Sequence, residues 1–352
     1  MTARGGTRDA ATNDGRPRAD GRDLDILVVG EINPDIVVAD PDPAPRFGEV
    51  ERMVASITMT VGSSSAIFAC AAARLGLRVA FFGVVGDDPF GRFMLEAMAG
   101  RGVDVSACTI DPARPTGATV ILTSGRDRAM LTAMGTIGAL DVDAVPASLI
   151  DRARHVHLGC FFLQATSRKR LPAFFRAARD RGLTTSFDTN WDPTEAWDGG
   201  VHDLIATADV VLPNAAEATR IARLDDPADA ARQLAERGAA GRAGEEFPSG
   251  GAEVGPLVVV KDGASGALAS AAGGPIVRVP AMPVDPIDTT GAGDNFDAGF
   301  LVGWLAGEPL EACLELGAVC GGLSTRAVGG VDGQPTLFEA HAALAEWRAA
   351  RR

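Results

Sequence analysis

The stretch that decides the fold is residues 288–300, which read DTTGAGDNFDAGF. Aromatic residues recur every four positions at 296, 300 and 304, and this spacing predicts an amphipathic helix that begins near Gly293. Gly291 and Gly293 therefore lie in a turn that leads into a helix N-terminus. Such a turn presents backbone N–H groups to an anion, and the helix dipole adds partial positive charge. We expect the turn to hold a phosphate group.

Asp294 opens this helix, where its carboxylate would repel a phosphate that was merely bound. The side chain makes chemical sense as a general base, which takes the proton of an attacking hydroxyl while the N–H groups hold the transferred phosphoryl. We expect the helix dipole to keep Asp294 ionised. The plainer alternative is a tight glycine turn with a carboxylate that stabilises the helix start. No Walker A loop occurs in the sequence, and no glycine motif supports a dinucleotide site.

Strands and helices alternate through most of the chain. Apolar runs at 24–30 and 78–83 predict buried strands, and the segments 64–75 and 89–99 predict helices. This alternation indicates an α/β fold with parallel β-α units. The other expected strands are HVHLG, TTSFD, DVVLPN and LVVVKDG, the other expected helices are 168–180, 215–223 and 228–237, and the C-terminal third is mostly helical.

Two β-rich stretches interrupt this alternation. Residues 103–134 show short alternating segments broken by turn signals, which is typical of antiparallel hairpins, and residues 50–60 form a similar short segment. We expect a small β sheet, formed by about residues 36–60 and 104–135, that covers one side of the core as a lid. Exposed edges of such a sheet can pair between subunits, so a homodimer is expected.

Composition and charge exclude several classes of partner. The 352 residues include 33 Lys and Arg and 46 Asp and Glu, so the net charge is −13. A surface this acidic argues against nucleic-acid and anionic-lipid partners. No apolar run approaches the roughly 18 residues of a membrane span. Residues 1–23 lack the apolar core of a secretory signal and indicate a disordered tail before a single domain at 24–352.

Three further features of the sequence are interpreted as structural. The five cysteines are scattered without a C-x-x-C pair, which is typical of buried thiols in a reducing cytoplasm. His155 and His157 alternate on one predicted strand, but no third ligand lies at a supporting spacing, so a structural role is favoured over a metal site. The Gly- and Glu-rich segment 238–256 is expected to be a mobile surface insertion.

Six segments, in order along the chain, resemble the PfkB (ribokinase-like) family of carbohydrate kinases. They are GEINPD at 30–35, GSSSAIFACAAARLG at 62–76, GVVGDDPFG at 83–91, NAAE at 214–217, VKDGASG at 260–266 and the signature at 288–300. The resemblance covers about residues 24–337. It implies a mainly parallel sheet with helices on both faces and ATP-dependent phosphorylation of a hydroxyl of a sugar or sugar derivative. The alternatives are a nucleoside kinase on the same fold and a ligand-binding homologue without catalysis.

The resemblance also implies roles for individual residues. Asp294 would be the catalytic base, and the backbone of Gly291, Ala292 and Gly293 would form the anion hole. The residues implied in acceptor binding are Asp35, Gly62, Ser63 and Asn190. The residues implied in ATP binding are Asn214, Lys261, Gly263, Gly266, Thr290 and Ser324.

The charge of the phosphates implies Mg²⁺ as a cofactor. Asn214 and Glu217 lie one helical turn apart and could face one site, where they would act on Mg²⁺ through water. The alternative is an N-cap Asn with a solvated Glu, which looks like a capping box. Many members of the family also hold K⁺, for which Asp288 and the carbonyl of Thr290 are the available positions here.

One position departs from the family pattern. Where the family's N-terminal signature usually has an Asn that contacts substrate hydroxyls, this chain has Ile67, which cannot form that hydrogen bond. Either the acceptor differs in that contact, or Ile67 packs in the core and the acceptor is held by Asp35, Asn190 or Asp192. These last two residues follow a predicted strand, where parallel sheets bind ligands, although a plain Asn/Asp turn accounts for them equally well.

Overall fold

The computed structural model describes residues 21–124, 127–242 and 255–351. Its centre is a nine-stranded sheet with the order β15-β14-β13-β12-β11-β10-β1-β4-β6. All neighbours from β13 to β6 pair in parallel, whereas β14 and β15 add an antiparallel edge. The strands are β1 (Leu24–Val29), β4 (Val79–Phe82), β6 (Val103–Asp104), β10 (Ala153–Leu158), β11 (Thr184–Phe187), β12 (Val210–Val211), β13 (Leu257–Lys261), β14 (Ala267–Ser270) and β15 (Val277–Val279).

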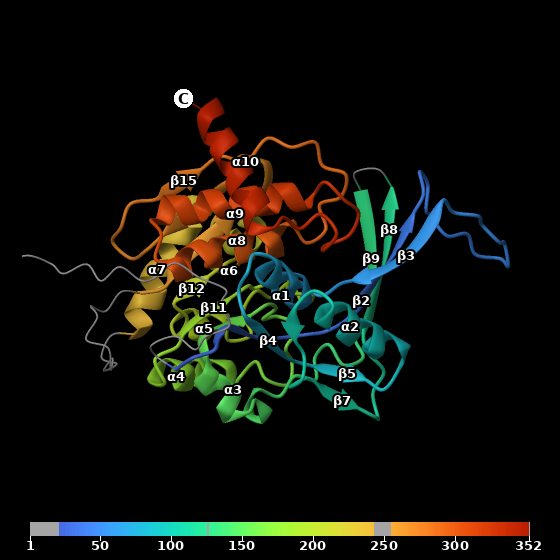
Figure 1. Cartoon of the computed structure of the whole chain (residues 1–352), viewed down its shortest axis with the longest axis horizontal. Coiled ribbons are helices and arrows are strands. Elements are labelled where there is room, and N and C mark those ends of the chain that lie inside the picture. Colours follow the sequence, from blue (N-terminus) through green and yellow to red (C-terminus); the bar gives the residue numbers. More distant parts are fainter. Residues whose placement is uncertain (1–20, 125–126, 243–254, 352) are drawn as a thin grey trace, which may run out of the picture.

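Helices cover both faces of this sheet (Figure 1). On one face, which buries Ile26 and Val28, lie α1 (Ser64–Arg74), α2 (Pro89–Ala99), α8 (Ala292–Ala306), α9 (Leu310–Ser324) and α10 (Leu337–Ala350). On the other face, which buries Leu27 and Val29, lie α3 (Ala147–Arg152), α4 (Leu171–Asp180), α5 (Val201–Ile205), α6 (Ala215–Ala222) and α7 (Pro227–Arg242). The α/β architecture inferred from the alternation of elements is therefore present, with a mainly parallel sheet between two helical layers.

A second, four-stranded sheet projects from one side of the molecule (Figure 1). Its order is β3-β2-β8-β9, from β2 (Pro34–Ala39), β3 (Ser56–Val61), β8 (Ala118–Ser124) and β9 (Asp127–Ala133). The register places Asp35 and Thr119 on the face toward the main body, where both are buried. The opposite face carries Ile57, Met59 and Leu131, which are exposed. We call this opposite face the outer face of the small sheet.

The segment between Val103 and Gly117 differs from the expected antiparallel hairpin. β6 extends the main sheet in parallel with β4, and β7 (Thr109–Asp111) pairs in parallel with β5 (Val84–Gly86). Two hydrogen bonds hold the following turn against the start of α2: Thr116 N–H donates to Asp88 Oδ2 at 2.7 Å, and Gly86 N–H donates to Thr116 Oγ1 at 2.8 Å. Alternating short strands predict pleated backbone but not which strand becomes the partner.

The expected surface insertion at 238–256 begins inside a helix. α7 continues to Arg242, whose Nε donates to the carbonyl of Ala206 at 2.8 Å, and a Cβ on Gly238 would lie 2.4 Å from Pro256. The helix therefore packs against the body beyond residue 237. Residues 243–254, like residues 1–20 of the expected tail, lie outside the described part of the chain.

The two strand histidines form a buried polar chain on the sheet. His155 Nε2 lies 2.6 Å and His157 Nδ1 lies 2.8 Å from the hydroxyl of Ser186, and the His157 ring stacks on Phe68 at 3.8 Å. Burial lowers the pKa of His155 to about 3 and that of His157 well below its ordinary value. Both rings are therefore neutral packing groups. The described residues include no cluster of three or more His, Cys, Asp or Glu suited to a metal ion.

Candidate active site

Charged side chains gather at the carboxyl edge of the main sheet. Glu31 and Asp35 follow β1, Asp188 follows β11, Lys261 ends β13, and Asp294 lies in the first turn of α8. Because the carboxyl ends of parallel strands meet at one edge, residues distant in the sequence come together there. This is the edge at which the sequence predicted ligand binding.

A glycine turn joins this edge to α8. Gly291 is the N-cap, with φ at 70°, and a Cβ there would lie 2.9 Å from both the Cα of Gly330 and the Cγ2 of Ile67. Asp288 braces the turn, since its Oδ1 accepts from the N–H and the hydroxyl of Thr290 at 2.9 and 2.7 Å, and its Oδ2 accepts from Gly329 N–H at 2.8 Å. The first N–H groups of a helix lack carbonyl partners within the helix, so this turn presents an anion-binding backbone.

Asp294 is buried directly behind that turn, with 9% of its surface exposed. Burial raises its pKa well above the ordinary value, the charges of Asp188 and Glu31 raise it further, and Lys261 and a hydrogen bond with Ser64 act in the opposite direction. Loss of water and the neighbouring carboxylates therefore oppose the helix dipole that was expected to favour the ionised form of Asp294.

Lys261 is the cation among these acids. Its Nζ donates to Asp188 Oδ2 at 2.7 Å and to Asp297 Oδ2 at 2.8 Å, and all three side chains are at most 10% exposed. Burial lowers the pKa of Lys261, but Asp188, Asp297 and Glu217 together raise it above the ordinary value. The side chain is therefore a permanent ammonium that ties the end of β13 to β11 and α8.

Polar side chains from α1, from the residues after β11 and from β2 form the acceptor side of the site. Asn190 donates through Nδ2 to Ser64 Oγ at 3.2 Å, and Ser64 in turn bonds to Asp294. Asp35 on β2 is buried against Gly62, where a Cβ would lie 2.3 Å from its Oδ1. Burial raises the pKa of Asp35 to about 7. Amide, hydroxyl and carboxyl groups here match the donors and acceptors that a polyol requires.

Asn214 and Glu217 form the capping box that was the alternative to a magnesium site. Glu217 N–H donates to Asn214 Oδ1 at 2.9 Å, and Glu217 Oε2 accepts from Asn214 N–H at 3.0 Å. Glu217 is nevertheless buried, also accepts from Thr189 Oγ1 at 2.7 Å, and has its pKa raised to about 7 by burial and Asp188. The solvated Glu of that alternative is absent, because this carboxyl is buried and bonds to Thr189 at the active edge.

A cavity of about 610 Å³ opens beside the glycine turn. Lys261, Gly263 and Gly266 line it, together with Ala292 and Gly293 at the start of α8. Its far wall is apolar and consists of Ala281, Met282, Pro283, Val284, Pro286 and Phe296. An apolar pocket that ends at a helix N-terminus has the form of a site for an aromatic base with attached phosphates.

Comparison with known proteins agrees with this geometry. The model of the pfkB family carbohydrate kinases matches residues 23–337. The chain belongs to this family. It is an ATP-dependent carbohydrate kinase.

Relatives of this family kinase cover nearly the whole chain. It is 29% identical to the ATP-dependent ribose-1-phosphate kinase of Halopiger xanaduensis, over 91% of this chain and 98% of the relative. It is 32% identical to the fructokinase of Klebsiella pneumoniae, over 78% and 88% of the two chains. A solved ribokinase from Arabidopsis thaliana, complexed with ribose and ATP, shares the fold with a TM-score of 0.74 and 22% identity, over 91% and 98% of the two chains.

Of the residues assigned to the kinase site by resemblance, only Lys261, Gly263, Gly266, Ala292 and Gly293 line the 610 Å³ cavity. Thr290 and Ser324 do not line the 610 Å³ cavity, whereas their neighbours Thr289 and Thr325 do. Ser324 Oγ instead bonds the carbonyl of Gly321 inside α9. Ser63 caps α1 by accepting from Ala66 N–H at 3.1 Å, and its hydroxyl also lies 2.6 Å from the carbonyl of Glu31.

Ile67 packs in the core, as one of its two readings predicted. It is 3% exposed and touches the backbone of Gly291 and Gly330, and its carbonyl accepts from Gln334 Nε2 at 3.0 Å. In this kinase the side chain supports the glycine turn from behind.

Sequence reasoning missed two contributors to the kinase site. Ser64 was hidden in a run of three serines, in which only the three-dimensional turn shows which hydroxyl faces Asp294. Asp297 follows Asp294 by three residues on the same helix, and an i, i+3 pair of acids in the signature was an available signal.

Trp191 directly follows Asn190 at this edge of the kinase. It is 40% exposed, meets Trp197 edge-on with 4.8 Å between ring centroids, and lies under the guanidinium of Arg220 at 4.9 Å. The indole is therefore anchored beside the acceptor side of the site.

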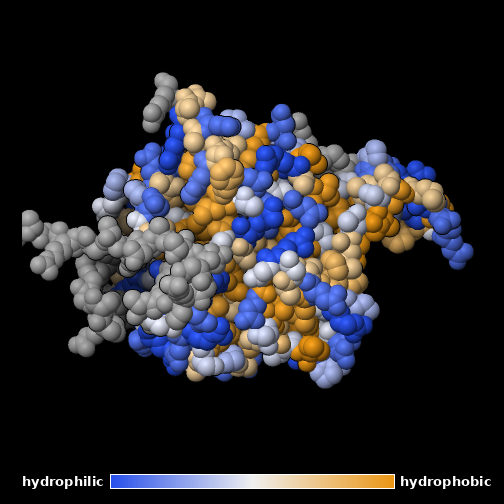
Figure 2. Space-filling view, viewed as in Figure 1, coloured by the Kyte–Doolittle hydropathy of each residue, from blue (hydrophilic) through white to orange (hydrophobic). Residues whose placement is uncertain are grey.

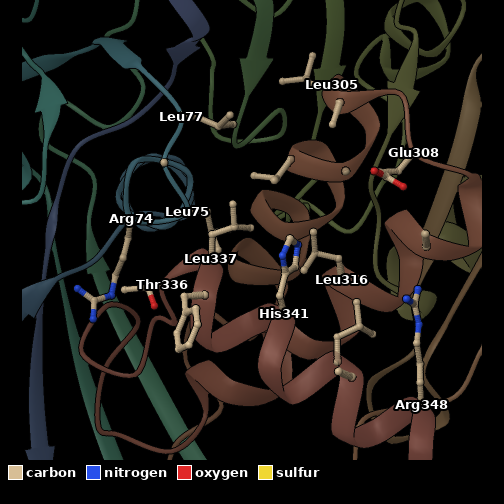
Figure 3. A pocket seen from close by; sticks show the side chains of 18 of the residues that line it. Arg74, Leu75, Leu77, Leu305, Glu308, Leu316, Thr336, Leu337, His341 and Arg348 are labelled. Atoms are coloured by element: carbon tan, nitrogen blue, oxygen red, sulfur yellow. The ribbon is translucent and has the colours of Figure 1, made fainter. Parts of the chain in front are cut away.

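The kinase has a larger cavity, of about 720 Å³, at the opposite ends of the same helices (Figure 3). Leu75 and Leu77 after α1, Leu305 of α8, Leu316 of α9 and Leu337 of α10 line it. Figure 3 shows His341 in its middle and Arg74 and Arg348 at its sides. α1 and α8 end at this space, whereas α9 and α10 begin beside it, where the side chain of Thr336 caps α10.

Proposed function

We propose that the protein transfers the γ-phosphoryl group of Mg²⁺-ATP to a hydroxyl of a sugar or sugar derivative, with Asp294 as the base. The observation that carries this proposal is the position of Asp294. It directly follows Gly293, which lines the 610 Å³ cavity, and it bonds to Ser64, whose hydroxyl accepts from Asn190. A triphosphate in the cavity would point its end at the acceptor.

The steps follow from these contacts. Asp35 and Asn190 hold the acceptor, and Asp294 takes the proton of the hydroxyl that attacks the γ-phosphorus. The bond from that phosphorus to the β,γ-bridging oxygen breaks, and ADP leaves. The N–H groups of Gly291, Ala292 and Gly293 stabilise the charge on the phosphoryl oxygens in the transition state. A carboxylate whose pKa is raised accepts a proton more readily near neutral pH than an ordinary aspartate does.

The described side chains alone form no metal cluster, so we propose a divalent cation that the phosphates of the nucleotide hold together with the acids of the site. Asp188, Asp294, Asp297 and Glu217 face one ammonium, that of Lys261, and the buried Asp297 Oδ1 has no hydrogen-bond partner. Glu217 and Asn214 would hold Mg²⁺ through water, since their side chains already bond to each other. When bound, Mg²⁺ neutralises phosphate charge. Asp288 and the carbonyl of Thr290 are the positions proposed for K⁺.

Replacing Asp294 by Asn tests the base. The expected result is loss of turnover by about two orders of magnitude or more, because general-base catalysis contributes about that much. Nucleotide affinity should remain close to that of the wild type, which calorimetry with Mg²⁺-ATP measures. A variant that turns over at the wild-type rate would remove Asp294 from the mechanism.

A panel of acceptors tests the substrate class. Sugars, sugar acids, sugar phosphates and nucleosides are incubated with Mg²⁺-ATP, and the release of ADP is measured. Phosphorylation of nucleosides alone would favour a nucleoside kinase, and no turnover with any of them would favour a ligand-binding homologue.

We also propose that the small sheet closes over the acceptor as a lid and pairs with the lid of a second copy. Asp35 reaches the acceptor side from β2, so the lid contributes to the site itself. Its outer face is apolar, with Ile57 65%, Met59 41% and Leu131 63% exposed, and Figure 2 shows apolar surface along this projecting sheet. Two such faces cover each other in a symmetric homodimer.

The cytoplasm is the proposed location. All five cysteines are free thiols, four of them buried, as is usual in a reducing compartment. Within residues 21–124, 127–242 and 255–351, no helix combines the length and the apolar character that crossing a bilayer requires.

A further inference from the structure

Lys261 has a hydrogen atom that its two carboxylate partners do not use. An ammonium has three N–H donors, and two of those on Nζ donate to Asp188 Oδ2 and Asp297 Oδ2. Among the described residues no third acceptor bonds to it. The side chain nevertheless lines the 610 Å³ cavity, so the third N–H borders space that a ligand can enter.

The same ammonium lies beside the backbone of the glycine turn. A Cβ on Gly293 would lie 3.6 Å from Lys261 Nζ and 3.7 Å from its Cδ and Cε. The lysine side chain therefore runs along the open side of Gly293. An anion bound to the N–H groups of the turn lies within reach of the charge.

The two carboxylates hold this charge in place. Asp188 directly follows β11, Asp297 lies one turn into α8, and both are buried, so the ammonium cannot swing away without leaving two unpaired buried acids. A charge fixed in advance costs little reorganisation when phosphate charge develops next to it. The two ion pairs therefore fix the position of the ammonium beside the glycine turn.

We propose that Lys261 contacts the terminal phosphate of ATP and complements the glycine turn as a clamp fixed by Asp188 and Asp297. This inference rests on the proposed function. It extends that function because it assigns a side chain, besides the backbone, to the phosphoryl group that is transferred. The contact is with the γ-phosphate, so it distinguishes a triphosphate from a diphosphate.

The test compares a triphosphate analogue with a diphosphate. Lys261→Met alone leaves Asp188 and Asp297 without their cation and can unfold the protein. The double variant Lys261→Met with Asp297→Asn removes one positive and one negative charge together. The matched control is Lys169→Met, since Lys169 is the only other lysine of the chain and is exposed.

Calorimetry with Mg²⁺-AMP-PNP and with Mg²⁺-ADP gives the readout. We expect the double variant to bind AMP-PNP about 10- to 100-fold more weakly than the wild type, the range of one charged hydrogen bond, and ADP within about 3-fold. The control variant should match the wild type with both nucleotides. Melting temperature is followed in parallel, because a purely structural lysine would change it and leave the ratio of the two affinities unaltered.

Two results would contradict the proposals. If the double variant keeps the wild-type ratio of AMP-PNP to ADP affinity, Lys261 does not contact the terminal phosphate. If the wild type itself binds neither nucleotide, the proposed kinase function fails, and this outcome is separate from the first.

Discussion

Two glycines of the same turn have different physical requirements. Gly291 has a positive φ of 70° and no room for a Cβ, whereas a Cβ on Gly293 would make only ordinary contacts at 3.6 Å. Gly291→Ala should therefore lower the free energy of unfolding by about 2–3 kcal/mol, through backbone strain and a clash with Gly330. Gly293→Ala should change it by less than about 1 kcal/mol.

Urea denaturation of the two variants measures this difference. Equal losses would show that the left-handed conformation of Gly291 is not what the turn requires.

Ile67 gives a second prediction at the scale of one residue. Ile67→Asn would bury an amide against Gly291 and Gly330, so it should destabilise the protein by about 2–4 kcal/mol through lost packing and an unsatisfied polar group. It should not broaden the acceptor panel, because the side chain supports the turn. New activity on a sugar that the wild type ignores would instead place position 67 in contact with the acceptor.

Local chemistry explains which residues could be predicted from the sequence. Asp294 and the glycines before it could be predicted from the sequence, because the turn, the acid and the helix are contiguous in the chain. Asp188 and Lys261 are 73 positions apart, and only the sheet brings their side chains to 2.7 Å. The raised pKa of Asp294 escaped prediction for the same reason, since the acids that raise it come from other strands.

At the scale of elements, the small sheet carries the prediction about assembly. Replacing Ile57 and Met59 by Asp places charge on the outer face of the small sheet and should convert a dimer into monomers of 36.3 kDa. Phe338→Asp is the control, since Phe338 is also apolar and 83% exposed but lies on α10. Sedimentation velocity measures the mass. A wild type that remains monomeric at high concentration would remove the lid-to-lid pairing.

Element type was easier to predict than element partnership. The strands of the main sheet and the helices that cover it could be predicted from the periodicity of apolar residues and from the glycines that end helices. Both signals act within a few residues. The path of residues 103–117 depends on which neighbour offers a free edge and on Thr116 meeting Asp88, and neither is visible in the local pattern. The extension of α7 to Arg242 likewise depends on contacts with residues about 35 positions away.

At the scale of the whole molecule, the buried His155 contributes stability that should be lost in acid. The folded pKa of His155 is about 3, below its unfolded value of about 6.5, so the unfolded chain binds more protons. Its contribution is complete above about pH 6.5 and is lost as the pH falls toward 3. Between pH 8 and pH 5 the stability that depends on His155 should fall by about 2 kcal/mol.

Buried acids with raised pKa values act in the opposite direction, so the test is a difference between proteins. Urea denaturation of the wild type and of His155→Gln is measured at both pH values. The stability advantage of the wild type should shrink by about 2 kcal/mol at pH 5. An advantage that does not depend on pH would mean that His155 is already protonated in the fold or stays neutral in the unfolded chain.

Trp191 provides the molecule with its own optical signal. The chain has four tryptophans and no tyrosine, so indole rings dominate its fluorescence. Trp191 is partly exposed and directly follows Asn190. Its ring contacts the indole of Trp197 and the guanidinium of Arg220. A sugar that displaces water beside Trp191 should change the wavelength and intensity of its fluorescence. Candidate acceptors can therefore be ranked by a fluorescence titration before any turnover is measured.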